Sequence, residues 1–137
     1  MQRVQIAQNV IEVEGDVVRS LVGCQSTLET ARPFFALAEQ VLHREGRLFL
    51  LTVNNHNYGV DSAARRYSYD WIRSHPISGA ANVGGGVAFT TILTMLSRAM
   101  ALVSTTVPPL AFFASEPEAL AWIDEQRRRQ MSKLPGP

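Results

Sequence analysis

The chain has 137 residues, of which 46% are hydrophobic and 18% are charged. This length predicts a single domain whose core is large enough to fold without disulfides or a structural metal. Thirteen basic and twelve acidic residues give a net charge of +1, which argues against electrostatic capture of nucleic acid. The single cysteine, Cys24, excludes an internal disulfide and a multi-cysteine zinc site.

Hydrophobic periodicity and turn residues predict five strands and four helices. Short β-branched runs alternate with segments whose apolar residues recur every three or four positions. In chain order the expected elements are strands 10–13 and 17–22, helix 26–45, strand 47–53, helix 63–75, strand 77–83, helix 87–103, strand 110–113 and a final helix after Ser115. The order β-β-α-β-α-β-α-β-α predicts an α/β domain with a mixed, mainly parallel sheet, to which the opening hairpin adds an antiparallel edge.

Capping residues define the ends of the first two helices. Thr30 as the N-cap of the first helix would place Pro33 in the first turn, where its missing N–H is no loss. Gly46 is expected to end that helix in the left-handed conformation. Asp61 is the expected N-cap of the second helix.

The C-terminal region predicts one more helix and a tail. Ser115 is the expected N-cap, and Leu120 and Ile123 are expected to face the core. We expect residues 1–130 to form one domain and residues 131–137 to be a disordered tail.

Targeting signals are not expected in this sequence. The N-terminal residues lack the unbroken apolar run of at least ~7 residues that a signal peptide needs. The most apolar stretch, residues 87–103, carries polar side chains and is shorter than the ~20 residues of a membrane span. The sequence therefore predicts a cytoplasmic protein without stable membrane insertion.

No cofactor, metal or catalytic site is expected from the motifs. Glycines 84–86 lack the lysine of a P-loop, and close packing of the backbone explains them equally well. The three histidines are too far apart in the sequence to suggest a metal site. Glu12, Glu14 and Asp16 are interpreted as a solvated turn, and the basic residues 127–129 as compensation of a helix dipole.

Three segments, taken in order, resemble small bacterial SpoIIAA-like proteins, in the group that joins STAS domains with CRAL-TRIO lipid carriers. They are the strand-to-helix passage at residues 48–66, the glycine-rich step at residues 80–84, and residues 112–123 (FFASEPEALAWI). The last segment is similar to the C-terminal signature of the group, and the resemblance covers residues 10–126. It implies helices packed largely on one side of the sheet, a role in binding, and no catalytic residues.

The resemblance also implies a candidate phosphoacceptor. In the anti-sigma-factor antagonists of the STAS family, a partner kinase phosphorylates a serine in an Asp-Ser-Ser-Gly stretch. Asp61 and Ser62 match its beginning, whereas Ala63 and Ala64 replace the second serine and the glycine. The alternative interpretation is that Asp61 or Ser62 is only a helix cap.

The helix at residues 87–103 is apolar around most of its circumference. Such a helix is buried, or it faces a partner or an apolar ligand. We expect its outer flank, around Met95, Met100 and Val103, to meet a second subunit or to line an apolar pocket. The alternative is a well-covered core helix.

These observations predict a non-catalytic, regulatory STAS-like module that acts through protein–protein interaction, either as a homodimer or with an unidentified protein partner. The predicted partner or ligand surface consists of Asn54, Asn55, Asp61, Met95, Met100 and Val103. One alternative is CRAL-TRIO-like binding of a lipid or another apolar ligand, which requires a cavity of ~300 Å³ or more between the sheet and the apolar helix. The other alternative is a phospho-switch at Ser62.

Overall fold

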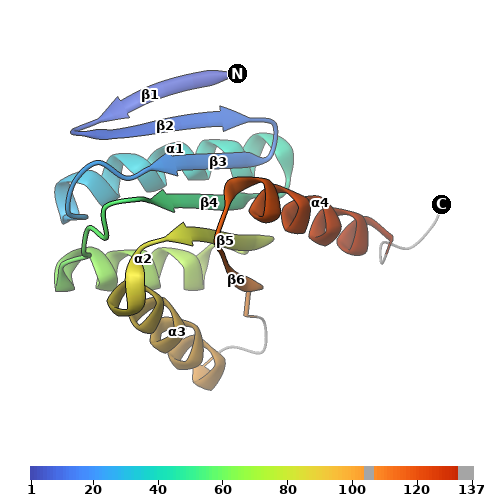
Figure 1. Cartoon of the computed structure of the whole chain (residues 1–137). Coiled ribbons are helices and arrows are strands. Elements are labelled where there is room, and N and C mark those ends of the chain that lie inside the picture. Colours follow the sequence, from blue (N-terminus) through green and yellow to red (C-terminus); the bar gives the residue numbers. More distant parts are fainter. Residues whose placement is uncertain (104–106, 133–137) are drawn as a thin grey trace.

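The computed structural model describes residues 1–103 and 107–132. This part of the chain contains six strands and four helices (Figure 1). Their bounds are β1 (Gln2–Ile6), β2 (Asn9–Glu14), β3 (Val17–Leu21), α1 (Leu28–Glu45), β4 (Phe49–Asn54), α2 (Ser62–Ser74), β5 (Gly79–Gly84), α3 (Gly86–Val103), β6 (Leu110–Phe113) and α4 (Glu116–Ser132).

One mixed sheet carries the six strands in their sequence order. β1, β2 and β3 pair antiparallel, and β3 to β6 pair parallel, with a helix in each parallel connection. β4 lies in the middle of the sheet. Its continuous apolar run is explained by burial on both faces, with Leu50 on one side and Phe49 and Leu51 on the other.

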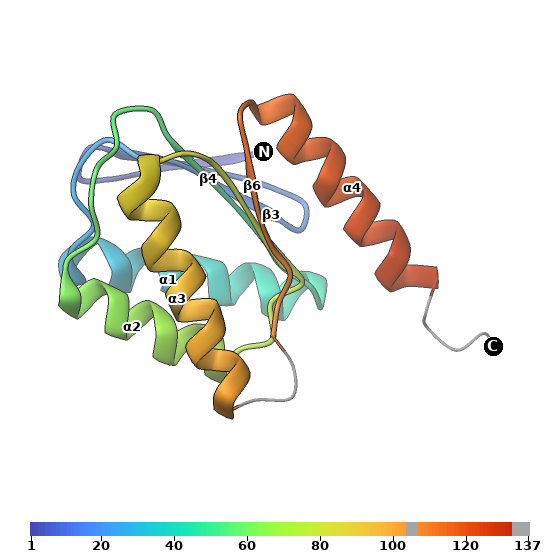
Figure 2. The same cartoon turned by 60° about the horizontal axis from the view of Figure 1, so that its bottom comes forward.

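The helices cover the two faces of the sheet unequally. α1, α2 and α3 lie on one face, and α4 lies on the other (Figure 2). On the first face Ile11 and Leu50 belong to the same buried core as Phe35 of α1. On the second face Leu51 packs with Ile123 of α4. This arrangement confirms the predicted fold class.

The sheet has one strand more than the sequence pattern indicated. β1 forms its edge and pairs with β2 from Gln2 opposite Val13 to Ile6 opposite Asn9. The apolar residues of β1 are only partly buried, and exposed polar side chains separate them. The hydrophobic signal of this strand is therefore weak, because it is an edge strand that depends on its neighbour.

The first helix begins within the expected segment 26–45, but its N-cap is not Thr30 as predicted. Its N-cap is Thr27, whose backbone N–H donates a hydrogen bond of 3.0 Å to the Thr30 hydroxyl. Thr30 therefore lies in the first turn, and Pro33 lies inside the helix, where it removes one helical hydrogen bond. The end at Gly46, with a φ of 75°, is as predicted.

The core-facing side of α4 differs from the prediction at one position. Ala119 and Ile123 are buried, as the spacing of one helical turn requires, but Leu120 is 45% exposed. Leu120 lies about 100° around the helix from Ala119, which turns it away from the sheet. The expectation that Leu120 faces the core is therefore wrong.

α4 also extends past the predicted end of the domain. The helix includes Met131 and Ser132, which were expected in the tail. The rest of the predicted tail, residues 133–137, lies outside the described residues.

The turn between β2 and β3 holds a buried carboxylate where a solvated one was expected. Asp16 is only 4% exposed and accepts hydrogen bonds from Arg127 of α4, at 2.6 and 2.9 Å, and from Arg47. Burial by itself raises the pKa of Asp16, but these hydrogen bonds from Arg127 and Arg47 lower it below its ordinary value. Arg127 thus ties α4 to the sheet, in addition to any effect on the helix dipole.

Candidate functional site

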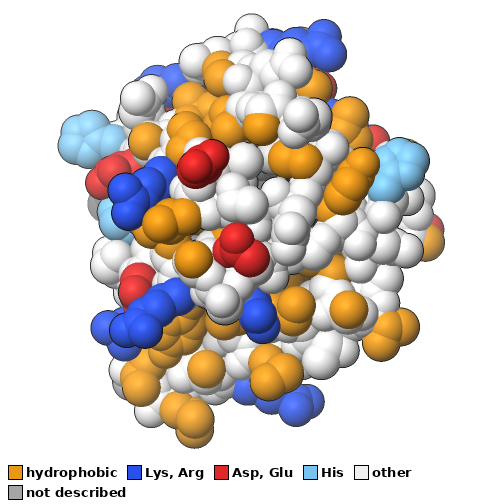
Figure 3. All heavy atoms as spheres, turned by 90° about the vertical axis from the view of Figure 1, so that its left-hand side faces the viewer, with side chains coloured by type: hydrophobic (Ala, Val, Ile, Leu, Met, Phe, Trp, Pro, Cys, Tyr) orange, Lys and Arg blue, Asp and Glu red, His pale blue; other side chains and the backbone are white. Residues whose placement is uncertain are grey.

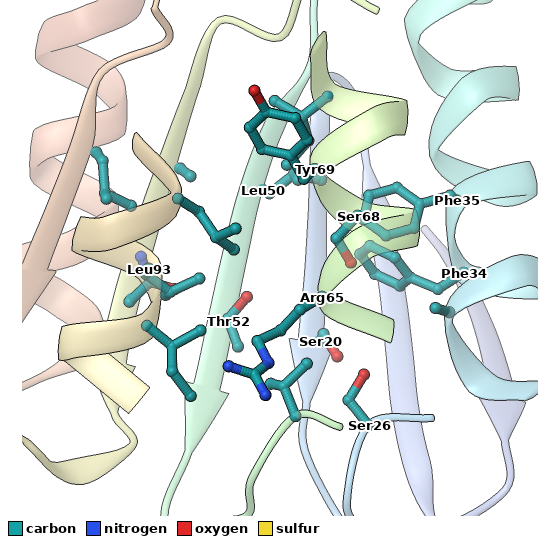
Figure 4. Close-up of a pocket in the computed structure, with 18 of the residues that line it drawn as sticks. Ser20, Ser26, Phe34, Phe35, Leu50, Thr52, Arg65, Ser68, Tyr69 and Leu93 are labelled. Atoms are coloured by element: carbon teal, nitrogen blue, oxygen red, sulfur yellow. The ribbon is translucent and has the colours of Figure 1, made fainter. Parts of the chain in front are cut away.

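A cavity of about 210 Å³ lies between the sheet and the three helices of its first face (Figure 4). Its walls come from β2 to β5, from α1, α2 and α3, and from the segment that leads into β6. The residues on α2 are Arg65, Ser68, Tyr69 and Ile72, whose spacing places them on one side of the helix. The cavity is thus a property of the tertiary packing of several elements.

One end of the cavity is apolar. Ile72 lies late in α2, Ile77 precedes β5, and Met100 lies late in α3. These positions converge near the end of the sheet at which the parallel strands begin, because each crossover helix runs back along its strand. Pro109 and Leu110 add to the same end.

The other end of the cavity carries polar groups. Ser20 and Thr52 lie near the carboxyl ends of β3 and β4, and Ser26 follows β3. Arg65 extends from the first turns of α2 into the space between Thr52 and Ser20 (Figure 4). The carboxyl ends of parallel strands are the usual place for ligands in open α/β sheets.

Local hydrogen bonds fix the start of α2 and hence the position of Arg65. The Asp61 side chain accepts a hydrogen bond of 2.8 Å from the Ala64 N–H, which confirms Asp61 as the N-cap. The Asp61 N–H donates to the Ser26 carbonyl at 3.0 Å, and the Ser26 N–H donates to the Gly59 carbonyl at 2.9 Å. The loop before α2 is therefore attached to the loop before α1.

Arg65 is the single charged residue among the described residues that line the cavity. Its Nε atom is buried and has no hydrogen-bond partner in the described part of the chain. An unpaired polar group away from water costs free energy, and a partly desolvated guanidinium attracts an anion strongly. In the sequence Arg65 is recognisable only as one of two adjacent arginines. Its spacing with Ser68 and Ile72 could have shown that these three residues share one side of the helix.

α3 covers one side of the cavity and is poorly covered itself. Phe89 and Met100 are its two buried residues, and only 11% of the helix is buried. The alternative of a well-covered core helix is therefore wrong. By length and composition, with 18 residues and a mean hydropathy of 1.6, α3 meets the minimum for a membrane span, although it was expected to fall short.

The residues predicted on the outer flank of α3 do not share a face. Met95 and Val103 are exposed, at 63% and 60%, whereas Met100 points inward and lines the cavity. Met95 and Met100 are five positions apart, which turns them about 140° from each other around the helix. Of the three residues, only Met100 is placed as the pocket interpretation requires. Met95 and Val103 are exposed, and their contact with a partner stays a prediction.

The residues predicted in the loop before α2 also differ in their exposure. Asn54 is 1% exposed, and its side chain bonds to both the N–H and the carbonyl of Tyr58, at 3.0 and 2.8 Å. Asn54 thus holds its own loop and is not available to a partner, whereas Asn55 is exposed. Ser62 is exposed at the first position of α2, so its phosphorylation stays a prediction.

Figure 3 shows the side of the molecule that lies on the left in Figure 1, where α2 begins, and no single apolar patch dominates it. Hydrophobic side chains lie there in several groups, with polar and charged side chains between them. The six residues predicted as one partner or ligand surface do not form one surface. Asn54 and Asn55 lie in the loop before α2, and Asp61 is the cap of that helix. Met100 lines the cavity, whereas Met95 and Val103 are exposed on α3.

The glycines before α3 have a structural explanation. Gly84, Gly85 and Gly86 all have positive φ values, between 73° and 92°. A Cβ atom on Gly84 would lie 2.4 Å from the carbonyl oxygen of Asn54. The close approach of two backbones, which was one of the two interpretations of these glycines, thus accounts for Gly84. Within residues 1–103 and 107–132, no group of three His, Cys, Asp or Glu side chains could hold a metal ion.

Comparisons with known proteins agree with this architecture. No protein-family model matches the chain, and no curated protein matches it. Among solved structures, it is similar to the crystal structure of an uncharacterized protein of the DUF3478 family with a SpoIIAA-like fold from Shewanella loihica. The TM-score is 0.57 at 19% sequence identity, with 83% of this chain and 90% of the other chain covered.

This similarity defines a class of fold. The chain has a SpoIIAA-like, STAS-type fold, as the sequence resemblance implied. At 19% identity the similarity concerns the fold alone, so the function has to be argued from the site.

Proposed function

We propose that this SpoIIAA-like chain is a non-catalytic binding module that holds a small, largely apolar ligand in the cavity between the sheet and α1 to α3. The observation that carries the proposal is the cavity itself, with a volume of about 210 Å³. The space is partly open to solvent, and its lining is mainly apolar with a few polar groups, which is the usual character of a small-molecule site.

The volume limits the size of the ligand. It is below the ~300 Å³ that a lipid carrier was expected to need. An apolar cavity of about 150 Å³ is known to bind benzene, so by proportion this cavity accommodates roughly eight to ten non-hydrogen atoms. The proposed ligand is therefore a small molecule and not a whole membrane lipid.

Native mass spectrometry of the protein purified from cells tests this function, together with titration of the stripped protein with 1-octanol followed by NMR. We expect one small molecule per chain, or octanol-induced shifts at cavity residues such as Leu50 and Thr52. Ala80→Leu fills part of the cavity from β5 and should abolish binding. Ala36→Leu adds the same atoms at an exposed position of α1 and should leave binding unchanged.

A different result would favour the other functions considered. Bare chains with no bound molecule and no response to octanol would contradict the cavity proposal. If those bare chains were dimers, the interaction function would be favoured, with the exposed side chains of α3 as the first surface to mutate.

A further inference from the structure

We infer that the ligand of the cavity is a small amphipathic carboxylate, with its charged group on Arg65 and its apolar body toward Ile72 and Met100. This inference rests on the proposed function and adds the chemical class of the ligand. It is carried by the charge, the geometry and the size of the cavity.

The charge of the cavity is unbalanced. Arg65 contributes a guanidinium, and no described lining residue contributes an acidic group. The Nε–H of Arg65 is buried without a partner among the described residues. A carboxylate could accept two parallel hydrogen bonds from a guanidinium, which is the strongest pairing available to a planar anion.

The geometry of the cavity separates charge from apolar surface. Ser20, Ser26 and Thr52 lie at the end that Arg65 enters, together with apolar residues such as Val60, and their hydroxyl groups can donate further hydrogen bonds to an anionic oxygen (Figure 4). At the other end the lining changes to aliphatic side chains, which favour an apolar body. One cationic end and one apolar end match a ligand with a single anionic head.

The size of the cavity favours a carboxylate as that head. A carboxylate adds three non-hydrogen atoms, so the volume leaves room for roughly five to seven further carbon atoms. A phosphate ester would occupy more of the same space and leave less of the apolar end filled. Octanoate, at the upper end of this range, is therefore a suitable probe.

Calorimetric titration with octanoate and with 1-octanol separates the charge from the apolar body. The two probes share an eight-carbon chain, but the carboxylate is more strongly hydrated in water, so a purely apolar pocket would prefer the alcohol. We expect the wild-type chain to bind octanoate at least about tenfold more tightly than 1-octanol. Octanol binding equal to or tighter than octanoate binding would overturn the inference and leave the cavity proposal standing, whereas binding of neither probe would overturn both.

A matched pair of variants locates the charge. Arg65→Gln should weaken octanoate binding by about tenfold or more and leave octanol binding nearly unchanged. Arg66→Gln removes the same net charge at the exposed neighbouring position and should leave both affinities unchanged. Equal losses in the two variants would assign the effect to net charge and would overturn the role of Arg65.

Urea unfolding without ligand provides a second measurement for Arg65→Gln. If the guanidinium is held unpaired for a ligand, the variant should unfold at the same or a higher urea concentration than the wild type. A clear loss of stability would mean that Arg65 serves the fold, and it would contradict the inference. The preference of the wild type for octanoate over octanol remains decisive even if the variant does not fold.

Discussion

At the scale of single residues, the same side-chain types have opposite roles according to where the fold places them. Asp16 and Glu14 both lie at the β2–β3 turn, yet Asp16 is buried between two arginines and Glu14 is exposed. Arg65 and Arg66 are adjacent, yet only Arg65 lines the cavity. Such differences determine which charged groups are paired within the fold and which face the cavity.

The Asp16 cluster predicts a pH dependence of stability. The pKa of Asp16 is lower in the folded chain than its ordinary value of 3.8, so its stabilising effect is present above that pH and is lost as the pH falls through the folded value. Asp16→Asn should reduce the free energy of unfolding at pH 7 by about 2–3 kcal/mol, because Arg47 and Arg127 lose their shared partner. Urea unfolding at pH 7 and pH 3 should show that the difference between wild type and variant shrinks at the lower pH.

Arg128→Gln serves as the control for this cluster. Arg128 is exposed and pairs with Glu125 on the surface of α4, where an ion pair contributes little. Its variant should show the stability of the wild type at both pH values. A difference between Asp16→Asn and wild type that stays constant with pH would contradict the titration of Asp16.

The N-cap of α2 gives a second prediction at this scale. Asp61→Ala removes the acceptor of the Ala64 N–H and should cost about 1 kcal/mol of unfolding free energy. Ser62→Ala changes an exposed side chain one position later and should cost less than about 0.5 kcal/mol. Chemical denaturation of the two variants measures this, and equal effects would contradict the assignment of Asp61 as the cap.

At the scale of elements, the backbone between β5 and α3 has a conformation that few residue types can adopt. Three consecutive glycines have positive φ values there, and the Gly85 N–H donates to the carbonyl of Asn54 at 2.8 Å. This geometry brings the end of β5 against the end of β4 and directs α3 back across the cavity. The position of α3 therefore depends on backbone freedom that only glycine provides.

Gly84→Ala should be strongly destabilising for that reason. The added Cβ would meet the backbone of Asn54 at 2.4 Å, which cannot move as a flexible side chain would. We expect a loss of at least about 2 kcal/mol in thermal or urea unfolding. Gly59→Ala is the control, because a Cβ there meets no atom within 4 Å, and its effect should be within about 0.5 kcal/mol.

At the scale of the whole molecule, stability is distributed unevenly among the helices that cover the first face of the sheet. α1 buries six of its residues, whereas α3 buries two and exposes large apolar side chains such as Leu102, which is 88% exposed. Helices with little buried surface open at lower free energy than the core. α3 is therefore the helix that we expect to open most readily.

Hydrogen exchange measures this difference directly. Amides of α3 should exchange at least about tenfold faster than those of α1 and β4 in the free protein. A ligand that fills the cavity should slow exchange in α3 more than in α4, which lies on the opposite face of the sheet. Equal protection of α1 and α3 in the free protein would contradict this distribution of stability.

The sequence by itself determined the elements whose signal is local. The continuous apolar run of β4, the cap at Asp61 and the stop at Gly46 each depend on neighbouring residues, and the structure confirms them. The alternation of strands and helices was likewise sufficient for the fold class, and the order of three segments, above all residues 112–123, for the resemblance to SpoIIAA-like proteins.

Only the tertiary structure decided what depends on contacts between distant segments. β1 is a strand because β2 lies beside it, and Asp16 is buried because Arg127, 111 positions away, reaches it. The cavity exists only where three helices meet the sheet, so the separate roles of Met95 and Met100 and the unpaired position of Arg65 appear in no local pattern. Periodicity shows which side of a helix is apolar, but the volume enclosed between helices depends on their packing against the sheet.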